Sequence, residues 1–257
     1  MKNVHLLDLG EKEQINLPAY AEIVVPGNHQ AALEYAVEHW ITLFQEAIQD
    51  HGFFAVALSG GSTPKALYRL LSSSPYKEEI QWEQIYLFWS DERIVPLTDE
   101  QSNYRMAMEA GLKEVNLIPA HIHPMPVHLP PQQAALAYEE TLKQILEDRY
   151  LDLVMLGVGA DGHTASLFPG SSAMEEKNHL VLSPWIESKK NFRLTLSLPA
   201  INSSRKTVIY AFGKEKADFL SHLFMTPRKY PCQWVGVKDN PALWILDQEA
   251  AYKLPAF

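Results

Sequence analysis

The strongest constraint on the fold is an alternation of short apolar runs with longer amphipathic segments. The run 53–58 is apolar throughout, which is typical of a strand buried on both faces in a parallel sheet. The segment 29–50 before it repeats apolar residues at helical spacing, and Asn28 is a suitable N-cap residue. We therefore expect a Rossmann-like three-layer α/β/α sandwich with right-handed crossovers and a mostly parallel sheet.

The same alternation continues to the C-terminus. We expect further helices at 64–71, 102–110, 132–147 and 215–225. We expect further strands at 85–89, 153–156, 180–182, 194–198, 208–212, 233–237 and 243–246. No segment is long or polar enough to separate two domains, and the proline-rich stretch 118–131 is expected to be a surface connection. The sequence thus predicts one α/β domain over residues 1–257.

Charge and cysteine content exclude several classes of protein. The chain has 22 Lys and Arg against 31 Asp and Glu, a net charge of −9 that argues against a nucleic-acid partner. The single cysteine, Cys232, excludes an intramolecular disulfide framework and a cysteine-based zinc site. Apolar runs are too short to span a bilayer, and no targeting segment is visible. We expect a cytoplasmic protein without a membrane partner, and the sequence leaves its oligomeric state open, a monomer included.

A glycine-rich turn follows the first apolar strand. The motif Ser59-Gly60-Gly61-Ser62-Thr63-Pro64 joins that strand to a helix. We expect Ser62 or Thr63 to cap the helix and Pro64 to occupy its first position. The free N–H groups and the helix dipole then favour an anion, although an ordinary tight strand–helix turn would have the same sequence. No Gly-Lys-Ser/Thr follows, so the motif is not a Walker A loop.

A second glycine-rich loop, Gly157-Val158-Gly159-Ala160-Asp161-Gly162-His163-Thr164, follows the strand at 153–156. It contains GxGxxG, but only 164–168 remains for a helix before Pro169-Gly170, and the acidic residue expected about 20 residues on is missing. A dinucleotide site is therefore disfavoured. Instead, the loop presents His163, suited to proton transfer near neutral pH, two residues from Asp161, which could orient it.

Other charged residues also follow or flank strands. Arg93 belongs to the motif Ser90-Asp91-Glu92-Arg93, which is either a ligand contact or a solvated loop with an internal ion pair. Arg193 and Lys216 could supply positive charge to an anionic ligand, or could be solvated. The histidines of the proline-rich stretch, His121, His123 and His128, have no nearby carboxylate, so we expect no metal site there.

Together these motifs resemble the 6-phosphogluconolactonase family. The matching segments run in family order: SGGSTP at 59–64, DER at 91–93 with VP at 95–96 and SNY at 102–104, GVGADGHTASLFPG at 157–170, RLTL at 193–196, GKEK at 213–216, and WILD at 244–247 with AA at 250–251. The resemblance implies the same sandwich fold, no cofactor, and hydrolysis of 6-phospho-D-glucono-1,5-lactone to 6-phospho-D-gluconate in the pentose phosphate pathway.

The resemblance also implies roles for individual residues. The phosphate would lie on Gly60, Gly61, Ser62 and Thr63, with Arg193 and Lys216 adding charge-assisted bonds. Arg93 would contact the sugar ring or the developing oxyanion. His163, oriented by Asp161, would activate water.

Two positions bear on the comparison with this family. Pro124 follows His123 where family members often carry Arg, so that loop is not expected to add positive charge. Glucosamine-6-phosphate deaminases share the fold and a DGH motif but carry a carboxylate five residues after the histidine. Here that position is Phe168, which favours the lactonase. Two further functions stay open, a nicotinamide-dependent oxidoreductase and a non-catalytic sugar-phosphate-binding protein.

Overall fold

A six-stranded parallel sheet forms the centre of the computed structural model, which describes residues 20–147 and 149–254. The strands lie in the order β1-β10-β9-β5-β2-β3. Their bounds are Ala21–Val24 for β1, Phe54–Leu58 for β2, Ile85–Trp89 for β3, Leu153–Gly157 for β5, Lys206–Ala211 for β9 and Ala242–Leu246 for β10. The predicted α/β fold with a mostly parallel sheet is confirmed.

A second, antiparallel sheet lies beside the first and was not predicted. It pairs β4 (Asp91–Arg93) with β8 (Asn191–Leu196) and β8 with β6 (Val181–Leu182), while β7 (Trp185–Ile186) also pairs with β8. The charged motif at 90–93 is therefore a short strand in place of a solvated loop. Three consecutive charged residues carry no strand signal, and β4 forms only because β8 offers it a partner.

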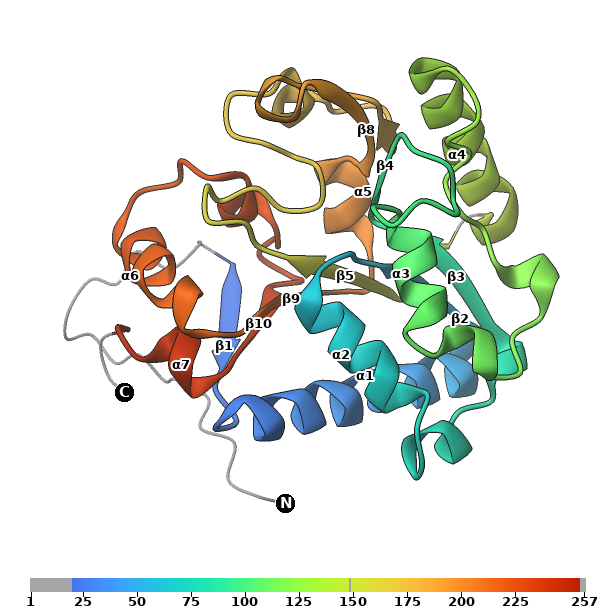
Figure 1. The fold of residues 1–257 in the computed structure, drawn as a ribbon, viewed down its shortest axis with the longest axis horizontal. Coiled ribbons are helices and arrows are strands. Elements are labelled where there is room, and N and C mark those ends of the chain that lie inside the picture. The colour runs from blue at the N-terminus through green and yellow to red at the C-terminus, as the bar shows by residue number, and fades with distance from the viewer. Residues whose placement is uncertain (1–19, 148, 255–257) are drawn as a thin grey trace.

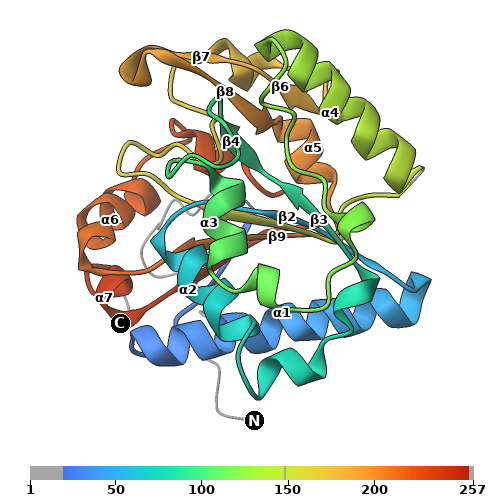
Figure 2. The same cartoon turned by 45° about the vertical axis from the view of Figure 1, so that its right-hand side comes forward.

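Helices cover both faces of the parallel sheet (Figure 1). They are α1 His29–His51, α2 Ser62–Leu71, α3 Asn103–Glu109, α4 Pro131–Leu146, α5 Leu198–Ser203, α6 Ala217–Met225 and α7 Gln248–Ala251. α1 and α2 lie on one side, and α4, α5 and the second sheet lie on the other (Figure 2). None of the described helices has the length and apolar character needed to cross a membrane.

Short 3₁₀ helices complete the described structure. They span Tyr76–Glu79, Trp82–Gln84, Leu112–Glu114, Pro119–His121, Ser172–Glu175, Glu187–Lys189, Lys214–Lys216 and Pro231–Trp234. The strand predicted at 233–237 is wrong, because Pro231 opens a 3₁₀ turn that Tyr230 and Gln233 cap reciprocally. The strand predicted at 194–198 ends early, because Ser197 caps α5 by accepting the N–H of Ala200.

The core follows the hydrophobic spacing of the sequence. Every residue of β2 is buried, as expected for a strand covered on both faces. The apolar positions of α1 face this sheet, and Trp40 packs edge-on against Phe54 with ring centroids 5.0 Å apart. Asn28 caps the helix by accepting the N–H of Ala31, as predicted. Aromatic packing thus fixes α1 across the sheet.

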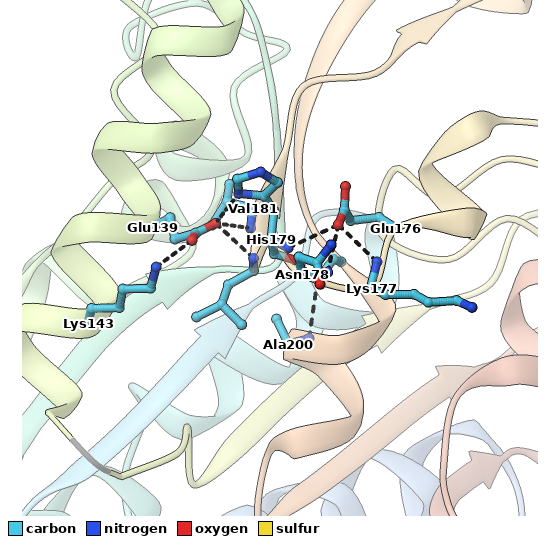
Figure 3. Close-up of polar contacts among 10 residues, drawn as sticks. Glu139, Lys143, Glu176, Lys177, Asn178, His179, Val181 and Ala200 are labelled. Atoms are coloured by element: carbon cyan, nitrogen blue, oxygen red, sulfur yellow. Dashed lines mark hydrogen bonds and ion pairs between the residues drawn. The ribbon is translucent and has the colours of Figure 1, made fainter.

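A buried carboxylate joins α4 to the second sheet. Glu139 accepts the N–H of Leu180 at 2.8 Å and of Val181 at 3.3 Å, and it pairs with Lys143 at 2.6 Å (Figure 3). Desolvation raises the pKa of Glu139, but the bonds from Lys143 and the two amides outweigh it and hold that pKa below its ordinary value. The ionised form of Glu139 therefore stabilises the start of β6.

We predict that Glu139→Gln lowers the free energy of unfolding by about 1–3 kcal/mol at pH 7, because a buried charge-assisted acceptor is lost. The matched control is Glu140→Gln on the exposed face of the same helix, with a change within about 0.5 kcal/mol. Urea unfolding measures both. Equal effects of the two substitutions would contradict the role of Glu139.

The effect of Glu139→Gln also depends on pH. A carboxyl whose folded pKa is depressed stabilises the fold above its unfolded pKa, about 4.3 for glutamate, and loses that contribution as the pH falls through the folded pKa. The difference in free energy of unfolding between wild type and Glu139→Gln therefore shrinks as the pH falls below the unfolded pKa toward the folded pKa of Glu139. A difference that stays constant with pH in the same unfolding series would refute this assignment.

Candidate active site

One cavity of about 290 Å³ lies where several loops meet beyond the carboxyl ends of the parallel strands. It is lined by residues from 59–64, from β4 and α3, from 157–165 and from 210–216. These segments follow or adjoin β2, β3, β5 and β9, which are neighbours in the sheet. The location is the one expected for ligands in an open α/β sheet.

The turn between β2 and α2 forms one side of this cavity. The helix begins at Ser62, its N-cap is Gly61 with φ at 110°, and no side chain bonds to its first turn. The prediction that Ser62 or Thr63 caps the helix is therefore wrong, because both lie inside the first turn. The first-turn N–H groups have no side-chain acceptor, and the positive end of the helix dipole faces the cavity.

Asn103 packs directly against this turn. A Cβ added to Gly60 would lie 2.0 Å from the side-chain oxygen of Asn103. The Asn103 amide is itself fixed, since it donates to the backbone oxygen of Asp91 at 2.9 Å and to its carboxylate at 3.1 Å. Only glycine at position 60 admits this contact. Nothing in the spacing of the sequence predicts it.

Arg93 reaches the cavity from β4. Its neighbour Glu92 is buried and accepts the N–H groups of Arg93, Asn103 and Tyr104, each at 2.8 Å. Burial raises the pKa of Glu92, and these amides oppose the shift. Glu92 therefore fixes the backbone around Arg93 instead of pairing with its guanidinium, which donates to the carbonyl of Gln101.

The loop after β5 places His163 in the cavity wall. Nδ1 of His163 lies 2.5 Å from the carboxylate of Asp161. Partial burial raises the pKa of Asp161, but the hydrogen bond and charge of His163 outweigh it, so that pKa lies below its ordinary value. An ionised Asp161 accepts the Nδ1 proton and leaves Nε2 as the basic nitrogen. Within the described residues, Nε2 has no hydrogen-bond partner.

The remaining predicted residues differ in position. Lys216 lines the cavity, and its ammonium donates to the carbonyl of Val158 at 2.9 Å. Arg193 lies opposite Arg93 in the β4–β8 pair and is not among the lining residues. Desolvation and then the charge of Arg93 lower the pKa of Arg193. The cavity therefore gathers the glycine turn, Arg93, His163 and Lys216, with Asp161 beside His163.

Sequence reasoning assigned no role to several lining residues. These are Asp91, Asn103, Ala165, Tyr210, Phe212 and Glu215. Asp91, Asn103, Ala165 and Glu215 belong to the family-matching segments, whereas Tyr210 and Phe212 had no signal beyond their place in the predicted strand at 208–212. The histidines at 121 and 123 lie elsewhere, with His121 stacked on Tyr86 at 3.9 Å. No cluster of three metal-ligating side chains occurs among the residues that the structure describes.

Comparison with known proteins now defines the class. The family model described as glucosamine-6-phosphate isomerases/6-phosphogluconolactonase matches residues 27–244, and the chain belongs to this family.

Individual relatives narrow the similarity within the family. The chain is 36% identical to a 6-phosphogluconolactonase of Synechocystis sp. over 88% of this chain and 95% of that one. It is 35% identical to a 6-phosphogluconolactonase of Chlamydia pneumoniae over 85% and 84%. The solved 6-phosphogluconolactonase of Trypanosoma cruzi superposes with a TM-score of 0.78 at 30% identity, covering 91% of this chain and 97% of that one.

We predict that Gly60→Ala lowers the free energy of unfolding by about 1–3 kcal/mol, because the new methyl group must displace the fixed Asn103 amide. Gly157→Ala is the matched control in the same cavity, since its Cβ would meet nothing within 4 Å. We expect that control to change stability by less than about 0.5 kcal/mol. Urea unfolding compares them, and a Gly60→Ala protein as stable as the control would contradict the contact.

Proposed function

We propose that this protein hydrolyses 6-phospho-D-glucono-1,5-lactone to 6-phospho-D-gluconate, a step of the pentose phosphate pathway. The observation that carries the proposal is the meeting of two features in one cavity. His163, paired with Asp161, lines it together with the uncapped start of α2 and the ammonium of Lys216. One part suits proton transfer from water, and the other suits a phosphate. The relatives named 6-phosphogluconolactonase support the same activity.

The phosphate binds at the glycine turn. The N–H groups over Gly60, Gly61, Ser62 and Thr63 donate to its oxygens, and the dipole of α2 adds attraction. Lys216 contributes a charge-assisted bond from the opposite segment. Arg193 adds positive charge through its place beside Arg93.

Hydrolysis then uses the imidazole twice. Nε2 of His163 takes a proton from water while the water oxygen bonds to the lactone carbonyl carbon, and the carbonyl electrons move onto its oxygen. Arg93 stabilises that oxyanion. When the carbonyl re-forms, the bond to the ring oxygen breaks and protonated His163 gives its proton to that oxygen. Asp161 stabilises the imidazolium meanwhile, and base catalysis of this kind contributes about 10²–10⁴-fold.

Position 168 favours hydrolysis over deamination. Phe168 is 9% exposed, so an apolar ring stands beside His163 where the deaminases of the family carry a carboxylate. No second acid–base group is present at that position. The chemistry needed here is the addition of water to a reactive ester, and one imidazole suffices for it.

We also propose that the chain works as one domain in the cytosol. Most buried apolar residues of the described part form one cluster that includes strands of both sheets. The only cysteine of the sequence, Cys232, is buried and unpaired, as suits a reducing compartment.

We predict that His163→Asn lowers kcat about 10²–10⁴-fold with little change in KM, because the base is lost while the phosphate contacts remain. The matched control is His128→Asn, an exposed histidine outside the cavity, which retains wild-type turnover. Freshly generated lactone is the substrate, and spontaneous hydrolysis is subtracted. Undiminished turnover by His163→Asn rules out the base role. A wild-type protein that turns over glucosamine 6-phosphate and not the lactone rules out the proposed reaction.

The phosphate assignment predicts a selective effect of Lys216→Met. Loss of its charge raises KM for the phosphorylated lactone by about one to two orders of magnitude, as for a hydrogen bond to a charged group. Turnover of unphosphorylated gluconolactone changes little. Lys214→Met, two residues away and outside the cavity lining, serves as control. An equal loss on both lactones would show that Lys216 does not bind the phosphate.

A further inference from the structure

An aromatic ring stacks on the imidazole of His163. The ring centroids of His163 and Phe168 lie 4.2 Å apart and the planes are inclined by 13°. Phe168 is buried, whereas His163 is half-buried and open to the cavity. The stack therefore supports the imidazole from the protein side and leaves part of the ring accessible.

A tight turn brings the two rings together. Thr164 and Leu167 exchange backbone hydrogen bonds, at 3.3 Å from the N–H of Thr164 and 2.9 Å from that of Leu167. Ala165 between them has φ at 47°, a backbone conformation rare for a non-glycine residue. The chain thus reverses direction within four residues, and this reversal places the side chain of Phe168 next to that of His163. Residues 164–168 therefore form a turn, whereas a dinucleotide-binding loop would be followed by a helix.

The second sheet holds this turn in place. The hydroxyl of Ser166 donates to the carboxylate of Asp91 at 2.7 Å, and its N–H donates to the hydroxyl of Thr195 at 3.2 Å. Ser166, Asp91 and Thr195 are all buried. The turn that leads to Phe168 is therefore anchored at Ser166 to β4 and β8, which do not belong to the loop that carries His163.

Two further contacts, with Asp161 and Gly159, lie at one edge of the imidazole. Asp161 holds Nδ1, and a Cβ at Gly159 would lie 2.2 Å from both Cε1 and Nδ1, so the glycine backbone lies against that edge. A ring held at one edge can still tilt about that edge. A tilt moves Nε2, the nitrogen at the far side of the ring, away from a bound water.

We propose that Phe168 is a positioning residue that fixes the plane of the His163 imidazole so that Nε2 points at the attacking water. The inference rests on the proposed function. Misplacing a reacting group by about 1 Å can cost about 10²-fold in rate, so a rigid stack is a sufficient reason for an aromatic side chain here. The same stack makes position 168 a specificity determinant, because a side chain that holds the imidazole in this way supplies no proton of its own.

Three variants test the proposal by kinetics. Phe168→Leu keeps an apolar side chain and removes the ring, and we expect kcat to fall roughly 10- to 100-fold with KM unchanged. Phe168→Tyr restores a ring and should recover most of kcat. Phe224→Leu is the matched control, since it removes a buried ring that packs on Trp244. Its kcat should equal that of wild type.

A spectroscopic measurement tests the stack without relying on activity. Protons above an aromatic face resonate upfield, so the imidazole C–H signals of His163, assigned with the His163→Asn protein, should lie upfield in wild type and in Phe168→Tyr. They should move downfield in Phe168→Leu. Circular dichroism shows that each variant is folded.

The outcomes separate the two proposals. An active wild type whose Phe168→Leu variant keeps full kcat overturns the role of Phe168 alone. So do equal losses in Phe168→Leu and Phe168→Tyr, or in Phe168→Leu and Phe224→Leu, since these indicate a general packing defect. Unshifted His163 signals in wild type also overturn it. A folded wild type that shows the shift and yet does not hydrolyse the lactone refutes the proposed function instead.

Discussion

The parallel register of the central strands is the constraint on which the rest of this structure depends. β2 pairs with both β3 and β5, and β5 pairs with β9. Because all these pairs are parallel, the segments that follow the strands emerge at one edge of the sheet. The glycine turn at 60–63, His163 and Lys216 thereby line one cavity of about 290 Å³, although Gly60 and Lys216 are more than 150 positions apart in sequence.

Buried carboxylates then fix the loops that this edge collects. Three buried carboxylates accept hydrogen bonds from backbone amides or small polar side chains. Asp91 and Glu92 lie in β4, and Glu139 lies in α4 and bonds to the backbone at the start of β6. A buried ionised group is costly unless such bonds satisfy it, and the same bonds order the backbone that donates them. The antiparallel second sheet thus acts as a support for the loops.

The sequence predicted what depends on local pattern. The strand at 85–89 has the predicted bounds, Asn28 caps α1, and both glycine-rich loops lie beside the cavity. It did not predict β4, whose charged residues form a strand only because β8 pairs with them. It placed the start of α2 two residues late, since Ser62 and Thr63 have the composition of caps and yet lie inside the helix. Contacts between distant segments, such as that of Asn103 with Gly60, cannot be predicted from the spacing of residues along the sequence.

The central claim is that one substrate spans the cavity, with its phosphate at the start of α2 and its lactone carbonyl at His163. A crystal structure of the protein with bound 6-phospho-D-gluconate tests it most directly. We predict the phosphate on the amides over 60–63 near Lys216, and the C1 carboxylate within hydrogen-bonding distance of Nε2 of His163. A phosphate bound elsewhere, or a C1 carboxylate that lies out of reach of that nitrogen, would contradict the claim.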